Sequence, residues 1–166
     1  CAAGHFYKSL KKIDKNISYT GFDSTKPYIN FAKIYFKDNP KTTFQRQNIF
    51  SLSKKYFNKY DIVFCSNVLL HLPSIDLALK NLIKATKKYC MIRTLVSENT
   101  HLSKFYHDDK TNKNGILNSF QFQNTYSYNL LRKKIKKIGN YKISFIDDKY
   151  NGNKINKEYI KYKKKY

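Results

Sequence analysis

The 166-residue sequence contains no long apolar run and no closely spaced pair of cysteines. A membrane-spanning helix needs about 20 consecutive apolar residues, and no stretch approaches that length. The first residues also lack the charged and then apolar pattern of a secretory signal. Three well-separated cysteines, Cys1, Cys65 and Cys90, argue against a disulfide framework or a zinc site. We therefore expect a cytoplasmic protein in which Cys65 and Cys90 are small buried apolar residues.

Arginine is scarce and acidic residues are few. The chain has 33 basic and 11 acidic residues and a formal net charge of +22, but its only arginines are Arg46, Arg93 and Arg132. Such a charge is typical of proteins that bind polyanions. Specific recognition of phosphates or bases, however, favours the arginine fork. We interpret the lysine excess mainly as solvated surface and AT-rich codon bias.

Strands and helices alternate along the chain. Ile62 to Cys65 form an unbroken apolar run, which is typical of a strand covered on both faces in a parallel sheet. Apolar residues at helical spacing follow Pro73 and predict an amphipathic helix. This alternation predicts a single α/β domain over residues 1–166, with crossover helices on both faces of the sheet. The expected strands are 17–23, 42–47, 60–66 and 89–96, and the expected helices are 5–13, 24–37, 51–57, 75–87 and 128–138.

Two later segments need separate interpretations. Residues 97–125 show no clear period and are too long for an ordinary connection, so they are expected to be a lid or a disordered insert. Residues 141–148 and 154–163 are joined through the Asn151-Gly152 turn signal and predict a C-terminal antiparallel hairpin.

The first residues have the composition of a ligand-binding loop. Ala2, Ala3 and Gly4 directly precede a helix whose Phe6, Leu10 and Ile13 are expected to share one face. Small residues at a helix start let a ligand approach the backbone closely. Asp23 comes 19 residues after Gly4, at the tip of the next strand, where a carboxylate can accept both hydroxyls of a cofactor ribose. The G-x-G-x-x-G fingerprint of NAD-binding proteins is absent.

Together these segments resemble the class I S-adenosylmethionine-dependent methyltransferase family, in the branch called methyltransferase type 11. The stretch "CAAG" is similar to the tail of the family's first cofactor-binding motif. The resemblance implies a Rossmann-like, doubly wound and mostly parallel sheet ending in the antiparallel hairpin. It also implies that the chain is truncated inside that motif, so that the family's first strand is missing before Cys1.

The resemblance implies S-adenosylmethionine as the cofactor and assigns the residues that would bind it. Asp23 lies at the ribose position and "RQNIF" at the adenine-contacting loop, where the family usually has Asp in place of Asn48. Ser66 and Asn67 follow a strand at the place where the methionine end is held. The complete expected set is Ala2, Gly4, Asp23, Ser24, Asn48, Ile49, Ser66 and Asn67.

Several of these residues have a simpler structural interpretation. Asp23 and Asn48 could cap the helices that follow them, and Gly4 could serve only a tight turn. His71 is a candidate general base, although a packing role beside the cofactor is the preferred interpretation. The "HDD" stretch at 107–109 resembles a metal cluster only in composition, and no metal is expected.

These features predict a methyltransferase that acts on a small molecule, lipid or saccharide. The N-P-P-[YF] signature of base-amino methyltransferases is absent, so a nucleic-acid acceptor is less favoured. The alternative function is a non-catalytic basic module that binds nucleic acid through its lysines and 15 tyrosines. The methyl acceptor, the oligomeric state and the role of residues 97–125 are left open.

Overall fold

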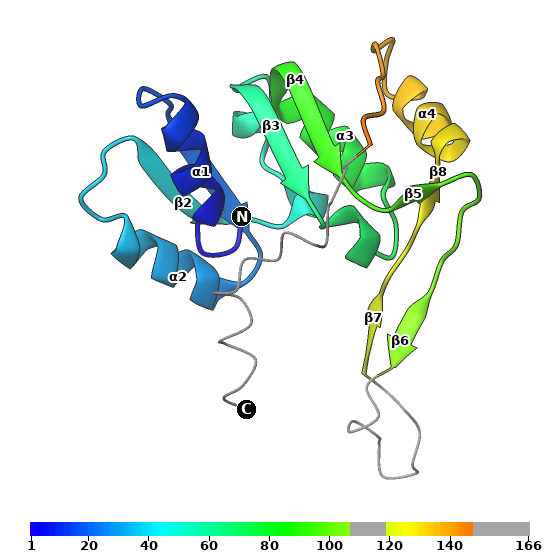
Figure 1. Cartoon of the computed structure of the whole chain (residues 1–166), viewed down its shortest axis with the longest axis horizontal. Helices are drawn as coiled ribbons and strands as arrows, with labels where there is room; N and C mark the ends of the chain where they lie inside the picture. The colour runs from blue at the N-terminus through cyan, green and yellow to red at the C-terminus, as the bar shows by residue number, and fades with distance from the viewer. Residues whose placement is uncertain (107–118, 148–166) are drawn as a thin grey trace.

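The computed structural model describes residues 1–106 and 119–147 (Figure 1). Helices and strands alternate through the first half of the chain, as the sequence pattern predicted. The helices are α1 (His5–Ile13), α2 (Lys26–Tyr35), α3 (Asp76–Ala85) and α4 (Tyr128–Lys136). The strands are β1 (Tyr19–Asp23), β2 (Thr42–Arg46), β3 (Tyr60–Ser66), β4 (Thr86–Arg93), β5 (Val96–Ser97), β6 (Lys104–Tyr106), β7 (Phe120–Phe122) and β8 (Tyr126–Ser127).

The described strands form pairs, most of them parallel. β1 pairs with β2, β3 with β4, and β5 with β8 in parallel, while β6 and β7 form an antiparallel ribbon. Helix α2 connects β1 to β2 and α3 connects β3 to β4, which are the crossovers that parallel pairing requires. The expected α/β fold with a mostly parallel sheet is confirmed.

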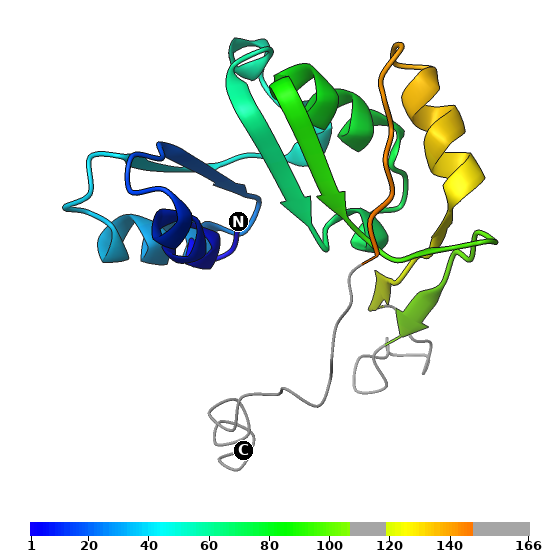
Figure 2. The same ribbon diagram turned by 45° about the horizontal axis from the view of Figure 1, so that its top comes forward.

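Figure 2 shows the β1–β2 pair and the β3–β4 pair as two separate pairs of strands. Side chains connect the two pairs. The ring of Phe22 lies 4.8 Å from the ring of Tyr56 and 6.1 Å from that of Tyr60, between centroids. Phe6 of α1 packs edge-on against Phe64 of β3 at 5.0 Å. Among the described residues, no backbone ladder joins β1 to β3.

The core has two centres. The larger one lies between β3, α3 and α4 and extends to β8; its buried members are Cys65, Leu69, Ile75, Ala78, Leu79, Tyr126 and Leu131. The smaller one lies between α2 and β2 and consists of Ile29, Ala32 and Phe44. The helical spacing that followed Pro73 thus correctly predicted the buried face of α3.

The expectation that β3 is covered on both faces is wrong for the described residues. Ile62 is 57% exposed and Phe64 is 44% exposed, and their partners on β4, Tyr89 and Met91, are also exposed. The cause is that α3 and α4 both pack on the opposite face, around Cys65.

Helix α1 buries a residue that its apolar spacing did not single out, and one further expectation needs correction. In α1 the buried residue is Tyr7, whereas Ile13 is 84% exposed, because the hydroxyl of Tyr7 is held by Asn39 and its ring packs on Phe36. Residues 141–147 form no strand, although a strand was expected over 141–148. A strand depends on a partner's hydrogen bonds, and the expected partner, 154–163, lies outside the described residues.

Candidate cofactor site

Asp23 is the centre of the candidate site, at the carboxyl end of β1. Its Oδ2 accepts a hydrogen bond from the backbone N–H of Ala2 at 2.8 Å and one from the amino group of Cys1 at 3.1 Å. Its Oδ1 accepts from the backbone N–H of Thr25 at 2.9 Å. The first loop and the end of β1 therefore meet at one carboxylate.

The surroundings of Asp23 favour the charged carboxylate. Partial burial acts to raise its pKa, but the hydrogen bonds from Thr25 and Ala2 and the positive charge of Cys1 outweigh burial and hold the pKa below its ordinary value. The side chain remains 19% exposed. An ionised, partly accessible carboxylate is the form that accepts hydrogen bonds from two hydroxyl groups.

The segment after β2 lies against the end of β1. Backbone N–H of Gln47 donates to the carbonyl oxygen of Asp23 at 3.0 Å, and Arg46 Nε donates to the carbonyl oxygen of Ser24 at 3.0 Å. Asn48 caps the short 3₁₀ turn Ile49–Ser51, since its Oδ1 accepts from Phe50 N–H at 2.9 Å. The capping interpretation of Asn48 is confirmed, whereas Asp23 bonds Thr25 in a local turn and α2 has Thr25 as its N-cap.

Ser66 and Asn67 lie at the carboxyl end of β3. Asn67 has a φ of 54° and donates its N–H to the carbonyl oxygen of Arg93 at 2.9 Å. Ala2 and Gly4 also have positive φ, at 45° and 83°. Non-glycine residues seldom adopt this conformation, and they cluster at functional sites when they do. Three of the four described residues with positive φ are residues that the sequence assigned to cofactor binding.

His71 forms a structural contact in the turn after β3. Its Nδ1 lies 2.8 Å from the carbonyl oxygen of Phe122 in β7. A carbonyl oxygen only accepts, so Nδ1 is the donor and Nε2 is the ring nitrogen left to exchange a proton in the neutral tautomer. A catalytic role for His71 therefore stays a prediction and would use Nε2.

The sequence analysis missed a buried polar network beside this turn. Asn124 is 2% exposed, and its Nδ2 donates to the carbonyl oxygen of Leu72 at 2.9 Å and to the hydroxyl of Tyr126 at 3.2 Å. Tyr126 in turn donates to the carbonyl oxygen of Leu69 at 2.9 Å. Asn124 lies within a stretch without periodicity, so no local signal distinguishes it from a surface asparagine.

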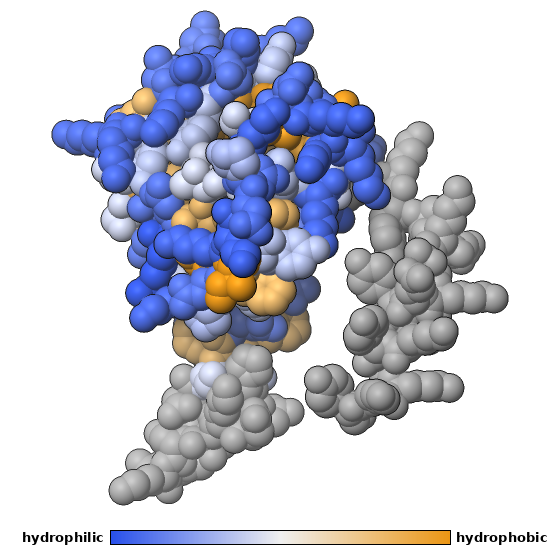
Figure 3. Space-filling view, turned by 90° about the vertical axis from the view of Figure 1, so that its left-hand side faces the viewer, coloured by the Kyte–Doolittle hydropathy of each residue, from blue (hydrophilic) through white to orange (hydrophobic). Residues whose placement is uncertain are grey.

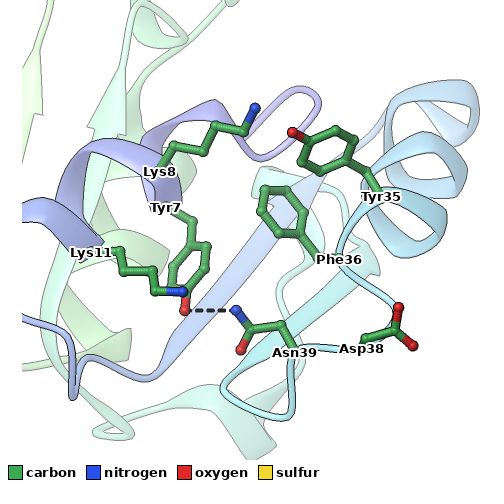
Figure 4. A pocket seen from close by; sticks show the side chains of 7 residues that line it. All are labelled: Tyr7, Lys8, Lys11, Tyr35, Phe36, Asp38 and Asn39. Carbon is green, nitrogen blue, oxygen red and sulfur yellow. Dashed lines mark hydrogen bonds between the residues drawn. The ribbon is translucent and has the colours of Figure 1, made fainter.

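The cavity shown in Figure 4 lies elsewhere. It has a volume of about 350 Å³ and is lined by residues of α1 and of the segment that joins α2 to β2, including Tyr7, Lys8 and Asn39. That segment precedes β2, so the cavity is at the amino ends of the strands, whereas open α/β sheets bind ligands at the carboxyl ends. We do not assign it to the cofactor.

Residues 1–106 and 119–147 contain no cluster of three His, Cys, Asp or Glu side chains able to hold a metal ion. The "HDD" stretch at 107–109 lies outside those ranges. None of the helices in the described ranges is long and apolar enough to cross a membrane.

A family model described as "Methyltransferase domain" matches residues 1–156. The chain belongs to the methyltransferase domain family. The resemblance to class I S-adenosylmethionine-dependent methyltransferases is thereby confirmed, and S-adenosylmethionine is the cofactor that membership implies. No curated protein matches the chain in sequence.

Solved structures share the fold of this methyltransferase domain at low identity. An S-adenosylmethionine-dependent methyltransferase from Mesorhizobium loti is 10% identical with a TM-score of 0.63, and the match covers 89% of this chain and 74% of that one. The N-terminal domain of EvdMO1 with SAH bound is 11% identical with a TM-score of 0.56, covering 83% of this chain and 61% of that one. The [4+2]-cyclase SpnF is 15% identical with a TM-score of 0.54, covering 82% of this chain and 47% of that one.

The methyltransferase domain described here spans only part of several matched proteins. It covers 25%, 47% and 29% of three of them. Since the cyclase shares this fold, the fold alone does not decide the reaction.

Proposed function

We propose that this domain binds S-adenosylmethionine and transfers its methyl group to a small-molecule, lipid or saccharide acceptor. The observation that carries the proposal is the Asp23 carboxylate at the carboxyl end of β1, to which Ala2 of the first loop donates at 2.8 Å. This arrangement suits a carboxylate that accepts both hydroxyls of a ribose. Family membership supports catalysis over the alternative of a non-catalytic basic nucleic-acid-binding module.

In this proposal each loop at the carboxyl edge of the sheet would contact a different part of the cofactor. Ala2 and Gly4 would approach it through the backbone, and Asp23 and Ser24 would hold the ribose. Asn48 and Ile49 would contact the adenine; Asn48 Oδ1 accepts one bond from Phe50 and has a second lone pair for the adenine amino group. Ser66 and Asn67 would hold the methionine end.

The bound cofactor would supply an activated methyl group on a sulfonium, so the protein's task is to position the acceptor and to exclude water. Residues 97–125 stay within the same single domain, and their part in closing the site, as a lid or only as an insert, stays a prediction. No general base is assigned, because one is needed only for an acceptor that holds its proton tightly.

A cytoplasmic location belongs to the same proposal and agrees with the free thiols of Cys1, Cys65 and Cys90.

Calorimetric titration of S-adenosylhomocysteine tests the assignment. We expect Asp23→Ala to weaken binding by about 10- to 100-fold, because hydrogen bonds to a charged group are each worth roughly 1.5–3 kcal/mol. Asp23→Asn keeps an oxygen for Thr25 N–H and separates the loss of charge from misfolding. The matched control is Asp38→Ala, which removes an exposed acid at the other end of the strands. Equal affinities for the wild type and both Asp23 variants would contradict the ribose contact.

A further inference from the structure

The β6–β7 ribbon, which we call the aromatic arm (Lys104–Tyr106 and Phe120–Phe122), carries an aromatic ladder on one face. Tyr106 pairs across the ribbon with Phe120, and Lys104 pairs with Phe122. Cross-strand partners share a face, so these four side chains lie together. Ring centroids are 5.5 Å apart for Tyr106 and Phe120 and 5.3 Å apart for Phe120 and Phe122. The Lys104 ammonium lies 4.7 Å from the centroid of the Phe120 ring.

The arm exposes much of its apolar surface. On the face of the ladder Tyr106 is 45% and Phe120 40% exposed; Phe105, on the other face, is 50% exposed, and Leu102 just before the arm is 70% exposed. A two-stranded ribbon is at best marginally stable in water by itself. Clustered exposed apolar residues of this kind mark an interaction surface.

The base of the arm is fixed to the body of the domain. Gln123 N–H donates to the carbonyl oxygen of Ser103 at 3.0 Å, and Asn124 N–H donates to that of Leu70 at 2.9 Å. Figure 1 shows the arm extending from the side toward which the arrows of β3 and β4 point. The arm therefore projects from the same edge that carries Asn67, and a partner bound to it would lie at the carboxyl end of the sheet.

The ring geometry and the charge favour one class of partner. Tyr106 and Phe120 are tilted by 52° and Phe120 and Phe122 by 89°, so the ladder has no coplanar platform for stacked bases. Amphipathic aromatic side chains beside lysine suit a membrane interface, where rings sit at headgroup level and ammonium groups meet lipid phosphates. A net charge of +22, nearly all from lysine, supplies the long-range attraction to an anionic surface.

We propose that the aromatic arm docks this domain onto an anionic lipid surface, with Tyr106 and Phe120 in the headgroup region and Lys104 on the phosphates. The inference goes beyond methyl transfer and does not depend on it. It assigns the arm an occupant that brings the carboxyl edge of the sheet to the membrane surface.

Vesicle sedimentation tests the proposal without cofactor or acceptor. We would use vesicles of equal parts phosphatidylcholine and phosphatidylglycerol, and vesicles of phosphatidylcholine alone. The wild type is expected to bind the anionic vesicles, to lose binding as salt rises, and to leave neutral vesicles unbound. The double variant Tyr106→Ser/Phe120→Ser is expected to bind at least tenfold more weakly at unchanged net charge.

The control variant is Phe31→Ser/Tyr35→Ser on α2. It also removes one phenylalanine and one tyrosine, which stack at 5.9 Å and are 57% and 53% exposed. They lie on the β1–β2 side of the domain, where Figure 3 shows mostly hydrophilic side chains. Unchanged binding by this control supports the proposal, whereas equal losses in the two double variants would overturn it.

Two further outcomes decide the partner. Lys104→Gln is expected to weaken vesicle binding about fivefold, the effect of one lysine near an anionic surface. If the double variant does not fold, the single variants Phe120→Ser and Lys104→Gln are each compared with the control variant in vesicle binding instead. Failure of the wild type to bind anionic vesicles would overturn the proposal, and so would arm-dependent binding of single-stranded RNA in its place.

Discussion

The side chain of Asn124 joins two segments that are 52 residues apart, since its Nδ2 donates to the carbonyl oxygen of Leu72 at 2.9 Å. Its Oδ1 also accepts from the N–H of Ser103 at 3.2 Å. One amide therefore connects the turn after β3 to both sides of the arm's base. A buried amide with every partner in place is costly to remove, because its partners are left without hydrogen bonds.

Asn124→Ala should destabilise the fold by about 2–3 kcal/mol, since three backbone and side-chain partners lose a bond in a buried position. Chemical denaturation measures the change in the free energy of unfolding. Asn99→Ala is the control, because Asn99 is exposed and is bonded through its backbone carbonyl. Equal stability of the two variants would show that the network does not hold the arm.

Gly4→Ala should be strongly destabilising. Gly4 has a φ of +83°, and a Cβ there would lie 2.8 Å from ring carbons of Phe36 and Phe44. The left-handed backbone and the overpacking together predict that the free energy of unfolding falls by about 2–4 kcal/mol.

Gly139→Ala is the matched control for Gly4→Ala in thermal unfolding. At Gly139 a Cβ would meet the ring of Tyr141, whose side chain is 48% exposed and can move away. A drop in melting temperature as large for Gly139→Ala as for Gly4→Ala would contradict the packing around Gly4.

Stability should fall as the pH rises above 9. Burial, with a smaller effect from Cys90, raises the pKa of the Cys65 thiol from 9.0 to about 12. The unfolded chain then loses this proton before the folded one does, so the stabilisation is complete below pH 9 and disappears toward pH 12. One proton changes the free energy of unfolding by at most about 1.4 kcal/mol per pH unit.

Urea denaturation of Cys65→Ala and Cys65→Ser between pH 8.5 and about 10 checks the assignment, because neither replacement titrates there. Both variants should have a flatter pH dependence than the wild type. Tyr19, whose burial raises its pKa to about 12, adds a further decline only above pH 10. If the free energy of unfolding fell with pH as steeply in both variants as in the wild type, the loss of stability at alkaline pH would be due to other groups.

A strand placed between β1 and β3 should stabilise the domain. The amino group of Cys1 donates to the carbonyl oxygen of Phe22 at 2.8 Å, so a chain leading into Cys1 would run beside β1. We expect an added five-residue extension of valine and isoleucine before Cys1 to raise the melting temperature by several degrees. It would bond the edges of β1 and β3 that have no strand partner among the described residues, and it would cover apolar surface. An extension of glycine and serine is the control, and an equal shift for both would contradict the strand.

Local sequence patterns predicted much of this architecture. The period of α3 is strong because Ile75, Ala78 and Leu79 are buried in one core and Leu82 packs against it. Periodicity reports such a face directly. Asp23 could be singled out because its distance from Gly4 follows from the length of one helix and one strand. Its dual role, bonded both to Ala2 and to Thr25, could not be read from that spacing.

Other features depended on which elements meet in space. The sequence by itself determined the order of strands and helices, the family and the place of Asp23, since these follow from local periodicity and fixed spacings. Only the tertiary structure decided that Tyr7 rather than Ile13 is buried, that Ile62 and Phe64 on one face of β3 are exposed, and that Asn124 connects the arm to the turn after β3. Each of these features depends on partners far away in the sequence. Hydrogen bonding and burial between two distant segments produce no periodic pattern in the sequence of either segment.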